Sequence, residues 1–427
     1  MAFCRLPWQG LMITPLGDFR VCALTNSTAM DEGMALDEDG KLMNIMTHSP
    51  NQGINGKWHR AIRVNDVENN DAWHSVCSCC SAREEANGSD IKHPSASRRH
   101  SMEWRVDSKN DPMGPATYKD FDMDKNGYVK WNPTNLDVRF GNLCNLACRM
   151  CHPYSSSLLA QEVAKDPVNA YTTIDIKFLE ENSWVKRSRL FDVVREQGHD
   201  LKSVYIIGGE PLIMDEQEEF LDLLIELDFA KNISLEYNSN ITTIGKKWYD
   251  KWSNFREVNL NASIDGVGSI YEYVRWPAKW DKIYNNLKEL QDWHKQDTTK
   301  NKVCVHSTLS NLTVPGIAET ADILIGEMNF NIFFINVDHP TCMRPEILPA
   351  SVKQTLARTG IEHIQKNFKD HYSLSNVVRT LERVVASSEP SEQDKIDFIK
   401  RMNYMDKHRK QNLLDLHPWF EEWYVHQ

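Results

Sequence analysis

The sequence predicts an α/β fold: a parallel sheet, open or closing toward a barrel, with a small irregular Cys-rich region before it and helices after it. From residue 135 onward, short apolar runs alternate with amphipathic stretches, as strands and helices do in a parallel α/β sheet. Eight of the ten cysteines fall within the first 151 residues. Beyond about residue 345 the strand-like runs stop and only helical stripes remain. A chain of 427 residues is long enough for two or three such domains.

Composition and charge exclude several classes of protein. With 41% hydrophobic and 26% charged residues, the chain is neither a collagen nor a coiled coil nor fully disordered. No stretch of 18 apolar residues and no secretory signal are present, so we expect a cytoplasmic protein without a membrane span. The 49 basic and 60 acidic residues give a net charge of −11, which argues against binding long nucleic acid. Clustered cysteines in this setting indicate metal ligands or redox groups.

The first 134 residues divide into a Cys-rich domain at 1–100 and a connector at 101–134. A hairpin is predicted around the turn Pro15–Asp18, which would hold Cys22 in place. In the connector, Asp122–Gly127 matches the first half of a calcium loop, but Pro133 stands where a bidentate Glu is needed. We therefore favour a hairpin turn at Asn126-Gly127.

Residues 135–345 contain the strand and helix alternation, and residues 346–427 form a C-terminal helical region. The predicted strands are 136–140, 203–207, 233–237, 258–264, 303–305 and 332–337. Two amphipathic stripes predict C-terminal helices, and they consist of Leu374, Val377, Val378, Leu381, Val384 and Val385, and of Ile396, Ile399, Met402 and Met405.

The strongest chemical signal is Cys144-x3-Cys148-x2-Cys151, in the loop after the first of these strands. Three thiolates on one short loop can hold three irons of a [4Fe–4S] cube, which leaves the fourth iron open to a small ligand. Tetrahedral zinc is the main rival, but the loop offers no obvious fourth ligand, because His152 is too close in sequence to complete a good tetrahedron.

This motif, with Gly208-Gly209-Glu210-Pro211 after the second strand, resembles the radical S-adenosylmethionine (SAM) enzymes over about residues 135–340. The resemblance implies a partial (β/α)6 TIM-like barrel and a [4Fe–4S] cluster whose open iron binds SAM. It further implies that an electron from a donor such as flavodoxin or ferredoxin cleaves SAM, and that the resulting 5′-deoxyadenosyl radical abstracts hydrogen from a substrate.

The resemblance also implies a set of SAM contacts near the ends of successive strands. These are Met150, Gly208, Gly209, Glu210, Asn238, Asn240, Ser263, Asp265 and Arg275. Glu210 and the two glycines match the segment that holds the SAM ammonium. Arg275 matches an arginine that pairs the SAM carboxylate, with a surface arginine as the alternative. Asp265 could instead only cap the following helix.

A second cysteine set lies near the start of the chain: Cys4, Cys22, Cys77 and Cys80, with Cys79 as an alternative to Cys77. Together with Phe3–Trp8, Gly17 and Glu84, it resembles the twitch domain, the short form of the SPASM domain. Here it precedes the barrel, as in a subset of radical SAM proteins many of which are phage-encoded. The resemblance implies an auxiliary [4Fe–4S] cluster, with zinc as the rival because C-x2-C with two distant cysteines also fits zinc.

Cys342 follows the sixth strand and is a candidate hydrogen donor to a substrate radical, with a structural thiol as the alternative. The expected substrate is a peptide, a protein or a small molecule, and analogy with twitch and SPASM relatives favours a peptide or protein. Two other functions stay open. One is a non-catalytic binding protein stabilised by zinc or Fe–S clusters; the other is an RNA-modifying radical SAM enzyme, for which the basic run Lys186, Arg187 and Arg189 is the only local support.

Overall fold

A computed structural model describes most of the chain. The described residues are 4, 6–23, 25, 33–69, 74–78, 80–81, 119, 121–130, 134–175, 184–369, 371 and 374–424. The chain divides into two compact units, the first comprising 1–141, 178–236 and 250–258, and the second 142–177, 237–249 and 259–427. Within the described ranges, no helix is both long and apolar enough to cross a membrane.

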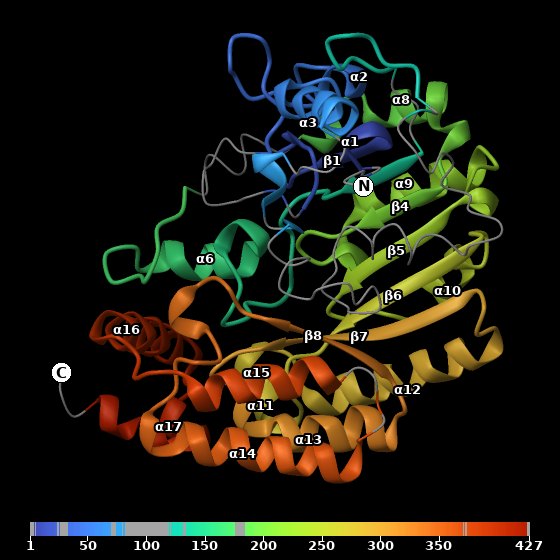
Figure 1. Cartoon of the computed structure of the whole chain (residues 1–427). Helices are drawn as coiled ribbons and strands as arrows, with labels where there is room; N and C mark the ends of the chain where they lie inside the picture. Colours follow the sequence, from blue (N-terminus) through green and yellow to red (C-terminus); the bar gives the residue numbers. More distant parts are fainter. Residues whose placement is uncertain are drawn as a thin grey trace. The chain divides into compact units, whose positions relative to one another are not determined.

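Eight strands form one sheet in the order β2-β1-β3-β4-β5-β6-β7-β8 (Figure 1). They are β1 (Gly10–Ile13), β2 (Phe19–Arg20), β3 (Asn135–Val138), β4 (Ser203–Ile206), β5 (Ser234–Ser239), β6 (Glu257–Ser263), β7 (Asn301–Leu309) and β8 (Asn331–Asn336). β3 pairs with β4 and β7 with β8 in parallel. The six strands predicted after residue 135 are confirmed, and so is a mostly parallel α/β sheet.

The predicted N-terminal hairpin is confirmed, but it does more than hold Cys22. β1 pairs antiparallel with β2, and its other edge pairs in parallel with β3 in the register Gly10↔Asn135 to Ile13↔Val138. All four residues of β1 are buried, as expected for a strand with a neighbour on both sides and cover on both faces. Part of the Cys-rich region is therefore built into the sheet.

The 122–130 segment forms the hairpin that we favoured over a calcium loop. Met123 and Val129 form an antiparallel bridge across the turn. The Asp124 carboxylate accepts from the backbone N–H groups of Asn126 and Tyr128 at 2.8 and 2.9 Å, so it closes the turn itself. Gly127 has φ +83°, which favours glycine at this position.

The first unit contains short helices around the N-terminal hairpin and longer ones between strands. They are α1 (Leu6–Gln9), α2 (Pro50–Gly53), α3 (Lys57–Glu68), α8 (Leu190–Gln197) and α9 (Asp215–Glu226), with the short turns η1 (Ser75–Cys77), η4 (Val185–Arg187), η5 (Gly198–Asp200), η6 (Pro211–Ile213) and η7 (Ala230–Asn232). α10 (Lys246–Trp252) runs across the boundary between the units.

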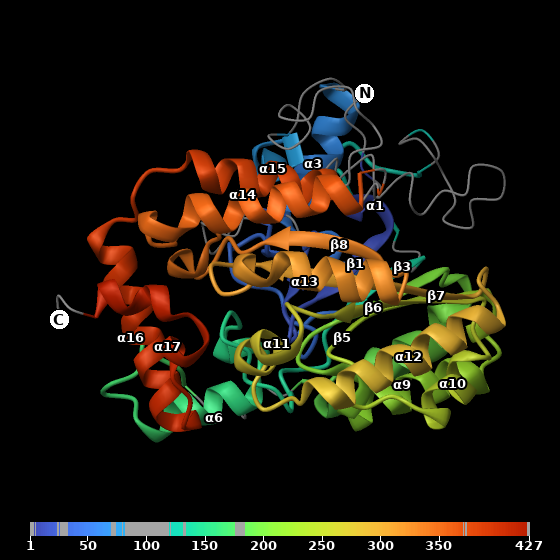
Figure 2. The ribbon, with the colours of Figure 1, turned by 90° about the horizontal axis from the view of Figure 1, so that it is seen from below.

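The second unit holds most of the helical mass. Its helices are α6 (Ser157–Lys165), α11 (Gly268–Val274), α12 (Trp280–Gln296), α13 (Ile317–Ala321), a π-helical turn η9 (Asp322–Glu327), α14 (Ala350–Asn367), α15 (Leu374–Ala386), α16 (Glu392–Arg409) and α17 (Leu413–Leu416), with short turns η3 (Pro153–Ser155), η8 (Val314–Gly316), η10 (Thr341–Met343) and η11 (Pro418–Trp423). Both predicted C-terminal stripes are helices. α14 and α15 lie side by side, as Figures 1 and 2 both show.

Candidate active site

The loop that carries Cys144, Cys148 and Cys151 is held by its backbone. It runs from Asn142 to η3 in the second unit. The N–H groups of Ala147 and Arg149 donate to the carbonyls of Trp276 and Val274, each at 2.8 Å, so the loop pairs with the end of α11. The loop is therefore ordered by contacts with its own unit and not only by the cysteines.

The thiols of Cys144 and Cys151 both lie within electrostatic range of the third thiol of this loop, that of Cys148. Burial raises the pKa of the Cys148 thiol, and the thiols of Cys151 and Cys144 raise it further against the opposing charge of Arg275. Burial also raises the pKa of Cys151, where Arg275 and Arg401 oppose it. Half-buried thiols on one loop whose ionisation is disfavoured by burial are suited to a positively charged centre, which would stabilise them as thiolates.

The donor set fits a cluster that takes three thiolates. The N–H of Leu146 donates to Sγ of Cys144 at 3.4 Å, the kind of hydrogen bond that tunes cluster sulfurs. In the ranges that the structure describes, no three Cys, His, Asp or Glu side chains already meet as a metal-binding group. The ligand roles of these three residues remain a prediction.

Arg275 and Asp265 form a buried ion pair beside this loop. The carboxylate accepts from Nη2 and Nε of Arg275 at 2.7 and 2.8 Å, and its other oxygen accepts from the Thr308 N–H at 2.7 Å. Burial alone would lower the pKa of Arg275, but Asp265 and Cys148 outweigh it and the net shift is upward. Two sequence-based alternatives are therefore wrong. Arg275 is not a surface arginine, and Asp265 does not cap α11, whose N-cap is Val267.

The polar residues at the ends of β5 and β6 are also in the second unit. Asn240 donates to Oδ1 of Asn145 at 2.9 Å and lies 4.0 Å from Sγ of Cys144. Asn261 donates to Asn238 at 2.9 Å, so Asn238 is tied to the neighbouring strand. Ser263 is the last residue of β6. Met150, between the second and third cysteines, is half-buried.

The Gly208-Gly209-Glu210 segment belongs to the first unit. Gly208 has φ +136°, and a Cβ there would lie 2.9 Å from the Gly141 carbonyl oxygen, which accepts from the Gly209 N–H at 3.1 Å. Glu210 is 1% exposed and accepts from the Leu212 N–H at 3.1 Å, which caps η6. Its burial excludes the simplest alternative, a solvated carboxylate in an ordinary turn. A role toward the SAM ammonium remains a prediction.

The N-terminal cysteines gather in the first unit. Burial raises the pKa of Cys77, and Cys4, Cys22 and Cys80 raise it further, so these three thiols lie within electrostatic range of Cys77. Cys79 lies outside the described residues. The donor set suits a tetrathiolate site, and both zinc and a cluster remain compatible with it.

Cys342 lies in η10 of the second unit and is 5% exposed. Burial raises the pKa of its thiol to about 11, so it stays protonated at neutral pH. A protonated thiol is the form that carries a transferable hydrogen, and its role in catalysis remains a prediction.

In a comparison with known families, the part of the chain that contains the three-cysteine loop matches one family model. Residues 138–321 match the family model described as the radical SAM superfamily. This range includes the three-cysteine loop and the pair of Arg275 with Asp265. The match supports an enzyme of that superfamily. No curated protein matches the chain.

Solved structures give weaker likenesses to the chain as a whole. Native anSMEcpe with bound AdoMet is 19% identical over 55% of this chain and 61% of its own, with a TM-score of 0.36. Streptococcus suis SuiB bound to precursor peptide SuiA is 15% identical over 54% of this chain and 46% of its own, also at 0.36. TYW1 with a lysine-pyruvate adduct bound is 15% identical over 54% and 73%, at 0.30. The chain thus spans less than two thirds of the first two, and at these scores the assignment depends on the family model.

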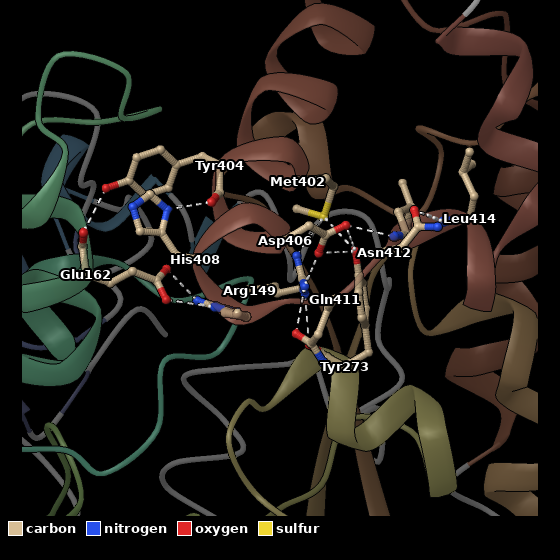
Figure 3. A network of polar contacts seen from close by, with 12 residues as sticks. Arg149, Glu162, Tyr273, Met402, Tyr404, Asp406, His408, Gln411, Asn412 and Leu414 are labelled. Atoms are coloured by element: carbon tan, nitrogen blue, oxygen red, sulfur yellow. Dashed lines mark hydrogen bonds and ion pairs between the residues drawn. The ribbon is translucent and has the colours of Figure 1, made fainter.

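Around the cysteine loop, the structure shows buried polar residues that the sequence analysis missed. Arg149, inside the cysteine motif, is fully buried and forms an ion pair with Asp406 of α16 (Figure 3). Its guanidinium carbon lies 3.5 Å from the centroid of the Tyr273 ring. One feature of the sequence could have predicted that Asp406 is buried. Asp406 and Arg409 follow Met402 at helical spacing, so these charges lie on the apolar stripe and not on a solvated face.

Proposed function

We propose that this radical SAM enzyme holds a [4Fe–4S] cluster on Cys144, Cys148 and Cys151 and acts on a peptide or protein substrate, within a partial (β/α)6 barrel. The observation that carries the proposal is that one loop of the matched residues 138–321 holds three half-buried thiols, two of which lie within electrostatic range of Cys148. When bound, the cluster and SAM would supply the chemistry, a one-electron cleavage that yields a hydrogen-abstracting 5′-deoxyadenosyl radical. A flavodoxin or ferredoxin would supply the electron.

The polar residues around the loop would orient SAM. Asp265 binds Nε and Nη2 of Arg275 and so fixes the plane of the guanidinium; we propose that the Nη1 edge pairs the SAM carboxylate. Glu210 and the glycines before it would hold the ammonium, and Asn238, Asn240 and Ser263 the ribose side. Met150 would contact adenine through its polarizable thioether.

The substrate class and the auxiliary site rest on the resemblance of the first unit's cysteines to a twitch domain. Cys4, Cys22, Cys77 and Cys80 would hold the auxiliary cluster, which would accept an electron from a substrate radical or bind substrate. The electrostatic effect of the other three thiols on Cys77 supports the grouping, and it does not distinguish iron from zinc.

The test is SAM cleavage by the full chain after anaerobic reconstitution with iron and sulfide. With dithionite and SAM, the wild type should release 5′-deoxyadenosine and a Cys148→Ala variant should not. Cys304→Ala is a matched control, because Cys304 lies within β7 and should leave the yield unchanged. A protein that retains zinc at both cysteine sets and no iron would overturn the proposal.

The auxiliary site is tested separately by metal content. Cys77→Ala should remove about half of the bound iron and leave 5′-deoxyadenosine formation in place, since the first cluster keeps its three ligands. Loss of zinc and no iron in this variant would show that the N-terminal site is a zinc site.

A further inference from the structure

We propose that α16 positions the cysteine loop and that Arg401 is the residue through which it acts; this rests on the proposed cluster on that loop. Arg401 is 6% exposed. Its Nε donates to the carbonyl of Arg149 and its Nη2 to the carbonyl of Cys151, both at 2.8 Å. One planar guanidinium thus binds two carbonyls on either side of Met150, which fixes the backbone that leads into the third cysteine.

The rest of α16 is fixed by two buried ion pairs, so the position of Arg401 is determined by the helix and not by its own side chain alone. Arg409 donates from Nε and Nη2 to the two carboxylate oxygens of Glu162 in α6, each at 2.9 Å. Asp406 pairs with Arg149 inside the motif. Figure 3 shows the pair between Asp406 and Arg149. α16 lies outside residues 138–321, so this device is separate from the matched domain.

The charge of Arg401 also acts on the loop. The guanidinium lies directly against a proposed cluster ligand, because its Nη2 donates to the Cys151 carbonyl at 2.8 Å. Its carbon lies 4.2 Å from the centroid of the Tyr171 ring, and its burial keeps screening by solvent weak. Reduction adds one negative charge to a cluster, and a buried cation beside one of its ligands favours that charge. Arg401 should therefore make the cluster easier to reduce.

The experiment is an EPR-monitored redox titration of the reconstituted full chain in four forms. The forms are wild type, Arg401→Gln, Arg401→Lys and Lys407→Gln. Lys407→Gln removes a cation from the same helix, but Lys407 is 70% exposed and pairs with Asp166 at 3.3 Å. We expect Arg401→Gln to lower the equilibrium constant for reduction about tenfold, which for one electron is about 59 mV. Arg401→Lys should retain most of the wild-type value, and Lys407→Gln all of it.

Positioning is measured without metal, by hydrogen–deuterium exchange of residues 144–151 in the iron-free proteins. The N–H of Arg149 donates to the Val274 carbonyl and the N–H of Cys151 to the Cys148 carbonyl, so both N–H groups report the order of the loop. Exchange should rise in Arg401→Gln and, to a smaller extent, in Arg401→Lys, because lysine has no planar fork. Lys407→Gln should exchange as the wild type does.

Three outcomes overturn the inference. One is an unchanged reduction potential in Arg401→Gln with full iron content. Another is an equal shift in Lys407→Gln, which would show a general charge effect. The third is unchanged loop exchange in both Arg401 variants. If Arg401→Gln does not fold, Arg401→Lys still decides the question through its exchange. A wild type that binds no iron refutes the proposed function, whereas the exchange experiment still tests the positioning by α16.

Discussion

Replacing Asp406 by Asn should leave the Arg149 guanidinium buried beside a neutral partner. In the wild type, the Asp406 carboxylate pairs with Arg149, accepts from the Tyr273 hydroxyl at 3.0 Å and accepts from the Leu413 N–H at 2.7 Å. The Arg149 and Asp406 side chains are 0% and 11% exposed, so solvent replaces little of the lost interaction. Breaking a buried pair by removing one charge costs about 3–5 kcal/mol. The Tyr273 ring and Gln411 Oε1, at 3.0 Å, stay in place, so we expect the lower end, about 3 kcal/mol.

Hydrogen exchange of α16 is the suitable assay, because a chain with two compact units need not unfold in one step. A loss of about 3 kcal/mol corresponds to an opening constant more than about a hundredfold larger. Lys407→Ala, which breaks the exposed pair with Asp166, should change exchange by less than about threefold. The reasoning is refuted if Asp406→Asn changes α16 exchange no more than Lys407→Ala does.

Three further predictions follow from single sites. Burial lowers the pKa of His417 to about 4, below an unfolded value of about 6.5, so the unfolded chain takes up the proton first as pH falls. The stability contributed by neutral His417 is present above pH 6.5 and is lost toward pH 4. Between pH 7 and pH 5, the free energy of opening around His417, measured by hydrogen exchange, should fall by about 2 kcal/mol more in the wild type than in His417→Gln, and equal losses would contradict this. Gly127→Ala should destabilise the 122–130 hairpin by about 1–3 kcal/mol, since φ is +83° and the new Cβ would lie 2.6 Å from a backbone oxygen; an unchanged melting temperature would refute it. Cys342→Ala should leave 5′-deoxyadenosine formation intact and lower formation of modified substrate, and unaltered product yield would count against a hydrogen-donating thiol.

Local patterns predicted the elements of the fold well. Apolar runs and alternation identified all six strands after residue 135, because burial on a sheet imposes a period of two or a continuous apolar run. The parallel pairing of β1 with β3 was not predictable in this way. Its partners, Gly10 and Asn135, are 125 residues apart, and nothing in a four-residue apolar run specifies which strand edge it will join. The predicted boundary after residue 100 therefore separates β1 from β3, the strand with which it pairs.

In the candidate site, too, local spacing was predictable from the sequence and contacts between distant residues were not. Cysteine spacing placed Cys144, Cys148 and Cys151 on one loop, because residues three and four apart lie within about 14 Å of each other even in an extended chain. The pairing of Arg275 with Asp265 and the contact between Arg401 and Cys151 depend on tertiary packing. Charged residues on a helix are usually solvated, so Arg401 gave no reason to expect a buried contact 250 residues away.

The long separation in sequence between the cysteine loop and Arg401 has a consequence during protein synthesis. Cys151 leaves the ribosome 250 residues before Arg401, which at about 5–20 residues per second is an interval of about 12–50 s. During that time the nascent loop lacks both the guanidinium that hydrogen-bonds its carbonyls and the helix that buries Arg149. Its three thiols can then react with oxidants or bind other metal ions. Delivery of the correct metal before translation ends would therefore meet a loose loop. Delivery afterwards would meet an organised one, so the timing of loading relative to synthesis should affect how much of the protein becomes correctly metallated in the cell.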